Sequence, residues 1–137
     1  MKTAILFYSL SGKTKTAAET LAKETGADLI EITEKRKRNL FTAFFSGCPQ
    51  AIGLKASKIN PPAEDLNTYD QLTLMAPIWA GHPAPALNAI IALLPEGKTI
   101  SLICTAGSPT DYPLAKTADL ITAKNCTITE TRCLKTQ

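Results

Sequence analysis

The chain has 137 residues, of which 45% are apolar and 20% charged, and its formal net charge is +3. This length predicts one compact domain over residues 1–137, and the composition excludes an intrinsically disordered chain. With no apolar run of about 18 residues, no membrane-spanning helix is expected, and the small positive charge gives no reason to expect nucleic-acid binding. Without a recognisable signal peptide, we expect a cytoplasmic protein.

The first strand is predicted at residues 4–8, a continuous apolar run. Runs of this kind are typical of parallel strands that are buried on both faces. The other predicted strands cover residues 29–32, 72–76, 100–104 and 127–133. The last of these alternates threonines with other residues, which indicates a half-exposed strand at an edge of the sheet.

Helices are predicted between these strands, where apolar residues recur at helical spacing. The predicted helices cover residues 14–25, 84–94 and 114–123, and Gly26 ends the first of them. Residues 41–54 are apolar but contain two glycines and a proline, so two short pieces are expected there. Strands that alternate with helices predict a doubly wound α/β fold with a five-stranded parallel sheet. Such sheets bind ligands beyond the carboxyl ends of their strands.

A loop rich in hydroxyl groups follows the first strand and leads into the first helix. The N–H groups at a helix start suit a phosphate, hydroxyl groups can add hydrogen bonds, and glycine allows close approach of the backbone. The six residues are Ser9, Leu10, Ser11, Gly12, Lys13 and Thr14. One alternative is a helix capped by Ser11 with no ligand. Another is a nucleoside-triphosphate loop, but that motif needs glycine where this chain has Phe7.

The second candidate segment follows the third strand and contains the single tryptophan of the chain. Its residues are Pro77, Ile78, Trp79, Ala80 and Gly81. A loop at the end of a buried strand can present an indole as a stacking surface for a planar ring. The alternative is a tryptophan that closes the end of the sheet as part of the core.

The first loop resembles the phosphate-binding loop of flavodoxins, with the pattern hydroxyl-x-hydroxyl-Gly-x-Thr directly after the first strand. The resemblance implies strand order 2-1-3-4-5 and noncovalently bound FMN, whose phosphate is held without a metal. It also implies that the backbone around Ala80 and Gly81 faces the redox edge of the flavin. The segment after the fourth strand is similar to the third flavin loop of the family, which implies that Thr105, Ala106, Gly107 and Tyr112 contact the flavin. Tyr112 either covers one face of the ring or belongs to the following helix.

The sequence departs from the flavodoxin pattern in three ways. It ends four residues after the predicted fifth strand, where the family has a final helix; it is basic, whereas flavodoxins are usually acidic; and residues 33–62 match loosely. The missing helix would leave part of one sheet face open, so we expect a homodimer that covers this face. A short natural variant with a polar face is the alternative.

The leading functional prediction is an FMN-binding electron carrier that exchanges electrons with partner proteins. No constellation of catalytic acid, base or nucleophile is visible. With four scattered cysteines and one histidine, His82, no metal site is expected and the thiols are expected to be reduced. The alternative is an FMN-dependent NAD(P)H:quinone or flavin reductase. A third possibility is a flavodoxin-like binding domain that has lost FMN.

Overall fold

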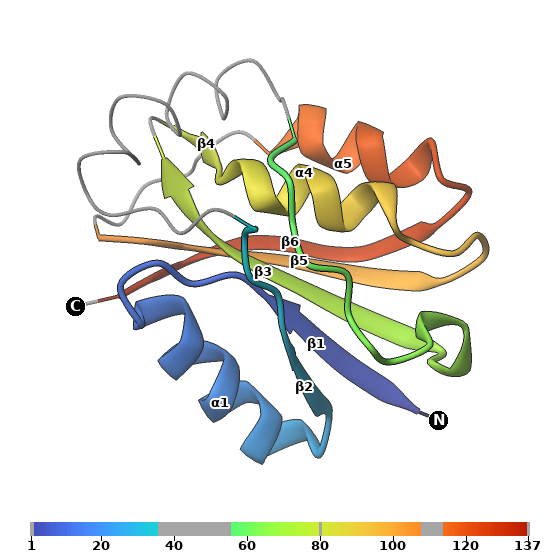
Figure 1. Cartoon of the computed structure of the whole chain (residues 1–137), viewed down its shortest axis with the longest axis horizontal. Helices are drawn as coiled ribbons and strands as arrows, with labels where there is room; N and C mark the ends of the chain where they lie inside the picture. The colour runs from blue at the N-terminus through green and yellow to red at the C-terminus, as the bar shows by residue number, and fades with distance from the viewer. Residues whose placement is uncertain (1, 36–55, 80, 108–113, 137) are drawn as a thin grey trace.

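The computed structural model describes residues 2–35, 56–79, 81–107 and 114–136, which build a sheet covered by helices on both faces (Figure 1). Five strands run parallel in the order β2-β1-β3-β5-β6. Their bounds are β1 (Thr3–Phe7), β2 (Asp28–Glu31), β3 (Gln71–Trp79), β5 (Thr99–Ala106) and β6 (Thr127–Lys135). When β4 is left out of the numbering, β5 and β6 are the fourth and fifth parallel strands, and the order is the predicted 2-1-3-4-5.

The helices lie on opposite faces of this sheet. α1 (Lys13–Thr25) covers one face, and α4 (Pro85–Ala92) and α5 (Ala115–Thr122) cover the other (Figure 1). The larger core cluster lies beneath α4 and α5, and a smaller one packs against α1. Because α1 ends at Gly26, whose φ is 75°, the predicted stop is confirmed. None of the helices in the described ranges is long and apolar enough to cross a membrane.

β3 is longer than the sequence predicted, because the chain stays extended beyond residue 76. It then turns back into β4 (His82–Pro83), which pairs antiparallel with the end of β3. Gly81 has a φ of 80° in this turn, a conformation that glycine adopts without steric cost. Pro77, Ile78 and Trp79, which were expected in an open loop, therefore lie in the last part of a strand. The pieces predicted over residues 41–54 fall outside the described residues.

The edge strand β6 carries polar side chains on the face that α1 partly covers. Arg132 pairs in register with Ile103, which packs in the α1-side cluster, so both side chains point to that face. The Arg132 Nε lies 2.5 Å from a carboxylate oxygen of Glu130, and a little under half of each side chain is exposed. A homodimer through this face, which stays a prediction, would have to bury this ion pair.

Candidate functional site

A pocket of about 150 Å³ lies at the carboxyl edge of the sheet, where the chain leaves β1, β3 and β5. The residues that line it come from all three predicted segments. They are Leu10, Ser11, Lys13, Thr14, Pro77, Ile78, Trp79, Thr105, Ala106, Gly107 and, in addition, Thr136. Segments about 90 residues apart in sequence thus meet at one place, because parallel strands all end at the same edge.

The start of helix α1 is open toward ligands because no side chain caps it. Gly12 is the N-cap residue, with φ 94°, and makes no side-chain cap hydrogen bond. The hydroxyl of Ser9 accepts a hydrogen bond from the N–H of Gly12 at 3.0 Å, within the loop before the helix. The alternative of a helix capped by Ser11 is therefore wrong. The backbone N–H groups of residues 13–15 have no hydrogen-bond partner within the described part of the chain.

Thr14 and Thr105 join the first and third segments through their hydroxyl groups. Their oxygens are 2.7 Å apart, and the Thr14 side chain is only 2% exposed. Thr14 was predicted to donate its hydrogen to a ligand directly, whereas the structure shows it in a bond with another hydroxyl. Two hydroxyls carry two hydrogens and use one between them, so the pair keeps one donor for a group in the pocket.

Trp79 contributes to the pocket and also packs against the protein. Its ring meets the ring of Tyr8 edge-on, with centroids 6.0 Å apart and planes at 78°. It also contacts the small cluster of Tyr8, Ala84 and Ala86. The side chain is half-buried, so the indole is held on one side and borders the pocket on the other.

The remaining predicted site residues fall into two groups. Ser9, Gly12 and Gly81 are described but do not line the pocket, because Ser9 and Gly12 shape the loop and Gly81 shapes the β3–β4 turn. Ala80 and Tyr112 lie outside the described residues. Thr136 was not predicted from the sequence as a site residue. It directly follows β6, and its N–H donates to the Ala106 carbonyl at 2.8 Å. Because β6 is parallel to the other strands and ends at the same edge of the sheet, its end was the sequence signal that could have identified Thr136.

Among the described residues that line the pocket, Lys13 is the sole one with a charged side chain. It lies in the first turn of α1, so its charge and the positive end of the helix dipole are both at this end of the helix. The nearby Cys104 lies in β5 outside the pocket lining, and burial, with a smaller contribution from Cys133, raises the pKa of its thiol far above the usual range. Cys104 is thus a neutral core residue. Within the described residues, no group of three His, Cys, Asp or Glu side chains could hold a metal ion.

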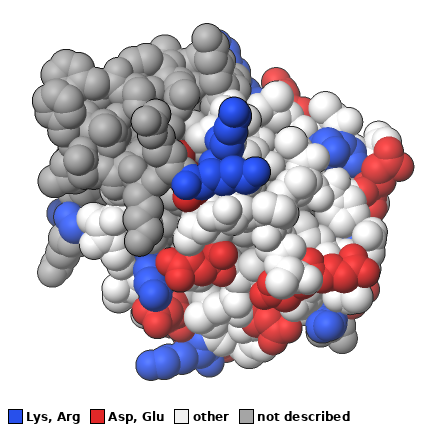
Figure 2. Space-filling view, in the orientation of Figure 1, with Lys and Arg blue, Asp and Glu red and all other residues white. Residues whose placement is uncertain are grey.

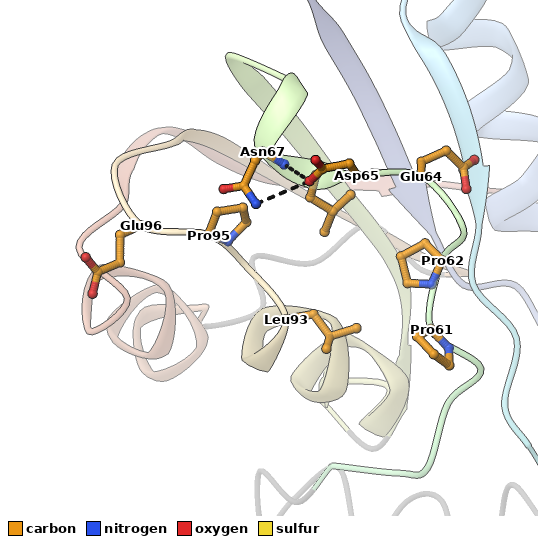
Figure 3. A pocket seen from close by; sticks show the side chains of 9 residues that line it. Pro61, Pro62, Glu64, Asp65, Asn67, Leu93, Pro95 and Glu96 are labelled. Atoms are coloured by element: carbon orange, nitrogen blue, oxygen red, sulfur yellow. Dashed lines mark hydrogen bonds between the residues drawn. The ribbon is translucent and has the colours of Figure 1, made fainter.

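A second, larger pocket of about 570 Å³ lies at the opposite, amino edge of the sheet (Figure 3). It lies between the connector that leads into η2 (Leu66–Thr68) and the end of α4. Its apolar residues include two prolines of the connector and Leu93, which is 44% exposed. Its charged side chains are Glu64, Asp65 and Glu96, and Asp65 accepts hydrogen bonds from Asn67. Such a lining does not suit an anion.

The surface toward the viewer mixes charges of both signs (Figure 2). Acidic side chains gather mainly over the lower half of this view, and basic ones are scattered between them. The described residues on this side therefore form no single basic surface.

Comparison with known proteins relates this architecture to flavoproteins. A flavoprotein from Lactobacillus acidophilus NCFM, crystallised in complex with FMN, superposes with a TM-score of 0.80 at 21% identity, covering 96% of this chain and 92% of that chain. A protein from Bacteroides eggerthii assigned as a flavoprotein gives 0.82 at 23% identity, over 97% and 87% of the two chains. Oxidised Flavodoxin 1 from Bacillus cereus gives 0.56 at 15% identity, over 100% and 87%.

No protein-family model matches the sequence, and no curated protein sequence matches it. The structural likeness shows that the chain has the flavodoxin-like fold, as the sequence predicted.

Proposed function

We propose that this protein binds FMN noncovalently in the pocket at the carboxyl edge of the sheet and serves as an electron carrier. The observation that carries the proposal is the uncapped start of α1, which opens beside a pocket that also holds hydroxyl groups, Lys13 and Trp79. Unpaired N–H groups and a cation suit a phosphate, and an indole suits a flat aromatic ring. FMN combines these two groups in one molecule.

The residues present fit FMN in their chemistry. The N–H groups of residues 13–15, the Ser11 hydroxyl and the free donor of the Thr14–Thr105 pair would hold the phosphate. Trp79, with Ile78 beside it, would give the ring an apolar surface and exclude water from it. The bound flavin would supply the redox chemistry, and the protein would set its position and access.

Electron transfer is proposed rather than catalysis because the described lining of the pocket offers no carboxylate or imidazole as a catalytic acid or base. Among its described lining residues, Lys13 alone is charged, and neither a carboxylate nor a histidine is present. His82 is in β4 and does not line the pocket. The Lactobacillus acidophilus flavoprotein with bound FMN supports the choice of cofactor.

Binding of FMN and of riboflavin to the purified protein tests the cofactor. Riboflavin has the same ring system without the phosphate, so we expect FMN to bind at least about 100-fold more tightly, as several charge-assisted hydrogen bonds would require. Equal affinities would contradict the phosphate site, and no binding of either flavin would contradict the proposal as a whole.

Reduction of the FMN-loaded protein tests the carrier against the reductase. A carrier should be reduced by NADPH only when a separate reductase is added, followed as loss of visible flavin absorption. Rapid bleaching by NADPH alone would show an NAD(P)H-dependent flavin or quinone reductase instead.

A further inference from the structure

Tyr8 directly precedes the hydroxyl-rich loop in sequence, and its ring contacts Trp79. It follows β1 directly, and its N–H donates to the Met75 carbonyl at 3.0 Å, which continues the pairing of β1 with β3. Its side chain is 4% exposed and packs in a cluster with Ala84, Ala86 and Trp79. The backbone of Tyr8 is therefore fixed by the sheet, and Tyr8 is not among the described residues that line the pocket.

Glu34 holds the other end of Tyr8. The Tyr8 hydroxyl donates a hydrogen bond to a carboxylate oxygen of Glu34 at 2.5 Å, and Glu34 is only 7% exposed. A buried carboxylate is costly unless it receives hydrogen bonds, so this contact binds both groups to one geometry. Glu34 is itself anchored through an antiparallel bridge to Ile59, flanked by a 3.0 Å bond from the Lys35 N–H to the Lys58 carbonyl.

The Tyr8 ring is placed to restrain the orientation of Trp79. The indole is half-buried and borders the pocket on one side. Its edge-on contact with the Tyr8 ring opposes a tilt of the indole plane. A Tyr8 ring that is fixed through its hydroxyl can hold the indole plane of Trp79 in place. A phenyl ring at position 8, which has no hydroxyl, could tilt together with the indole.

We propose that Tyr8 and Glu34 are positioning residues that set the plane of Trp79 against the flat ring of the ligand. The inference rests on the proposed function for the identity of that ligand. The chain of contacts runs from the Glu34 carboxylate to the Tyr8 hydroxyl, from the Tyr8 ring to the Trp79 indole, and from the indole to the pocket. Preorganisation of this kind raises affinity because binding need not order the indole.

The variant Tyr8→Phe tests the proposal because it keeps the ring and removes the hydrogen bond to Glu34. Trp79 is the single tryptophan, so its fluorescence anisotropy and its near-ultraviolet circular dichroism, read at wavelengths beyond the tyrosine bands, report the indole. We expect the tryptophan dichroism of the protein without FMN to fall by about half and the affinity for FMN to fall about three- to tenfold, as expected for loss of an oriented aromatic contact.

The matched control is Tyr69→Phe, which removes another tyrosine–carboxylate hydrogen bond at the far edge of the sheet. The Tyr69 hydroxyl donates to Asp28 at 2.8 Å. This variant should leave the tryptophan dichroism and the affinity for FMN unchanged. Glu34→Gln gives a second approach, because it keeps an acceptor oxygen and removes the charge, and it should change both readouts in the same direction by a smaller factor than Tyr8→Phe.

A double-mutant cycle with Trp79→Ala separates positioning from a general structural role. If Tyr8 acts through Trp79, Tyr8→Phe should weaken FMN binding in the wild-type background and have almost no effect in the Trp79→Ala background. Equal losses in both backgrounds, or an unchanged dichroism in Tyr8→Phe, would overturn the proposal and leave the proposed function standing. Failure of the wild-type protein to bind FMN would overturn the proposed function, and this inference with it.

Discussion

The two edges of the sheet each carry a pocket, and they differ in size and in charge. The pocket at the amino edge has about 570 Å³ and three carboxylates, whereas the one at the carboxyl edge has about 150 Å³, Lys13 and several hydroxyl and N–H donors. The smaller pocket is the candidate site because the larger one would repel an anion. In a parallel α/β fold the strand ends and the helix starts lie together at the carboxyl edge, so hydrogen-bond donors gather there.

The largest effect is expected for Thr14→Val, which removes the hydroxyl at the centre of the carboxyl-edge pocket. It removes the Thr14 hydroxyl from the pocket and leaves the buried Thr105 hydroxyl without its partner at 2.7 Å. FMN binding should weaken by about 1.5–3 kcal/mol, the scale of a hydrogen bond to a charged group, as measured by flavin fluorescence titration.

Thr20→Val is the control for that substitution. Thr20 lies on the same helix, is exposed, and donates to the Thr16 carbonyl at 3.1 Å. This change should leave FMN affinity within about a factor of two, since exposed sites far from a ligand contribute little. Unchanged affinity in Thr14→Val would mean that the phosphate is held elsewhere.

The second prediction concerns stability at the amino edge. The hydrogen bond from the neutral Tyr69 phenol to Asp28 raises the pKa of Tyr69, and burial and the charge of Asp28 act in the same direction. The folded protein therefore keeps the phenol proton at a pH where the unfolded chain has lost it. The stabilisation is complete below about pH 10 and is lost as the pH rises further toward the higher pKa of the folded state.

Tyr69→Phe should therefore lower the free energy of unfolding by about 1 kcal/mol at neutral pH and reduce the loss of stability above pH 10, as measured by urea unfolding. FMN affinity should not change, which separates the two edges. A loss of FMN affinity in this variant would show that the edges are coupled.

The third prediction concerns the charge of the carboxyl-edge pocket. Lys13→Gln should weaken FMN binding by about 0.5–1 kcal/mol at low salt, and the difference from wild type should shrink as salt is added, because exposed charges are screened. Lys23→Gln, in the last turn of the same helix, is the control and should have no effect. A salt-independent loss in Lys13→Gln would indicate a role other than electrostatic attraction.

The smallest effect is expected for the combined Glu64→Gln and Glu96→Gln substitutions in the amino-edge pocket. Both side chains are exposed and lie far along the strands from the proposed FMN site. Affinity for FMN should change by less than about a factor of two at physiological salt, where the Debye length is about 8 Å. A larger change would show that the amino edge takes part in ligand binding.

The sequence predicted the parallel sheet because its buried strands are short continuous apolar runs between amphipathic helices. It placed the edge strand and the helix stop at Gly26 correctly, since both depend on local patterns. It misplaced the end of β3, because Pro77 was taken as the start of a loop. Pairing with the nearby β4 and with β5 keeps that segment extended, and the residues of β5 are distant in the sequence.

By itself the sequence determined which residues carry hydroxyl, amide and aromatic groups at the ends of three strands, because strand and helix patterns are local. The tertiary structure alone decided that α1 starts without a side-chain cap, that Thr14 bonds to Thr105, and that Tyr8 joins Glu34 to Trp79. These contacts depend on the relative positions of strands and loops. The packing of the whole sheet sets those positions, and no single stretch of sequence specifies them.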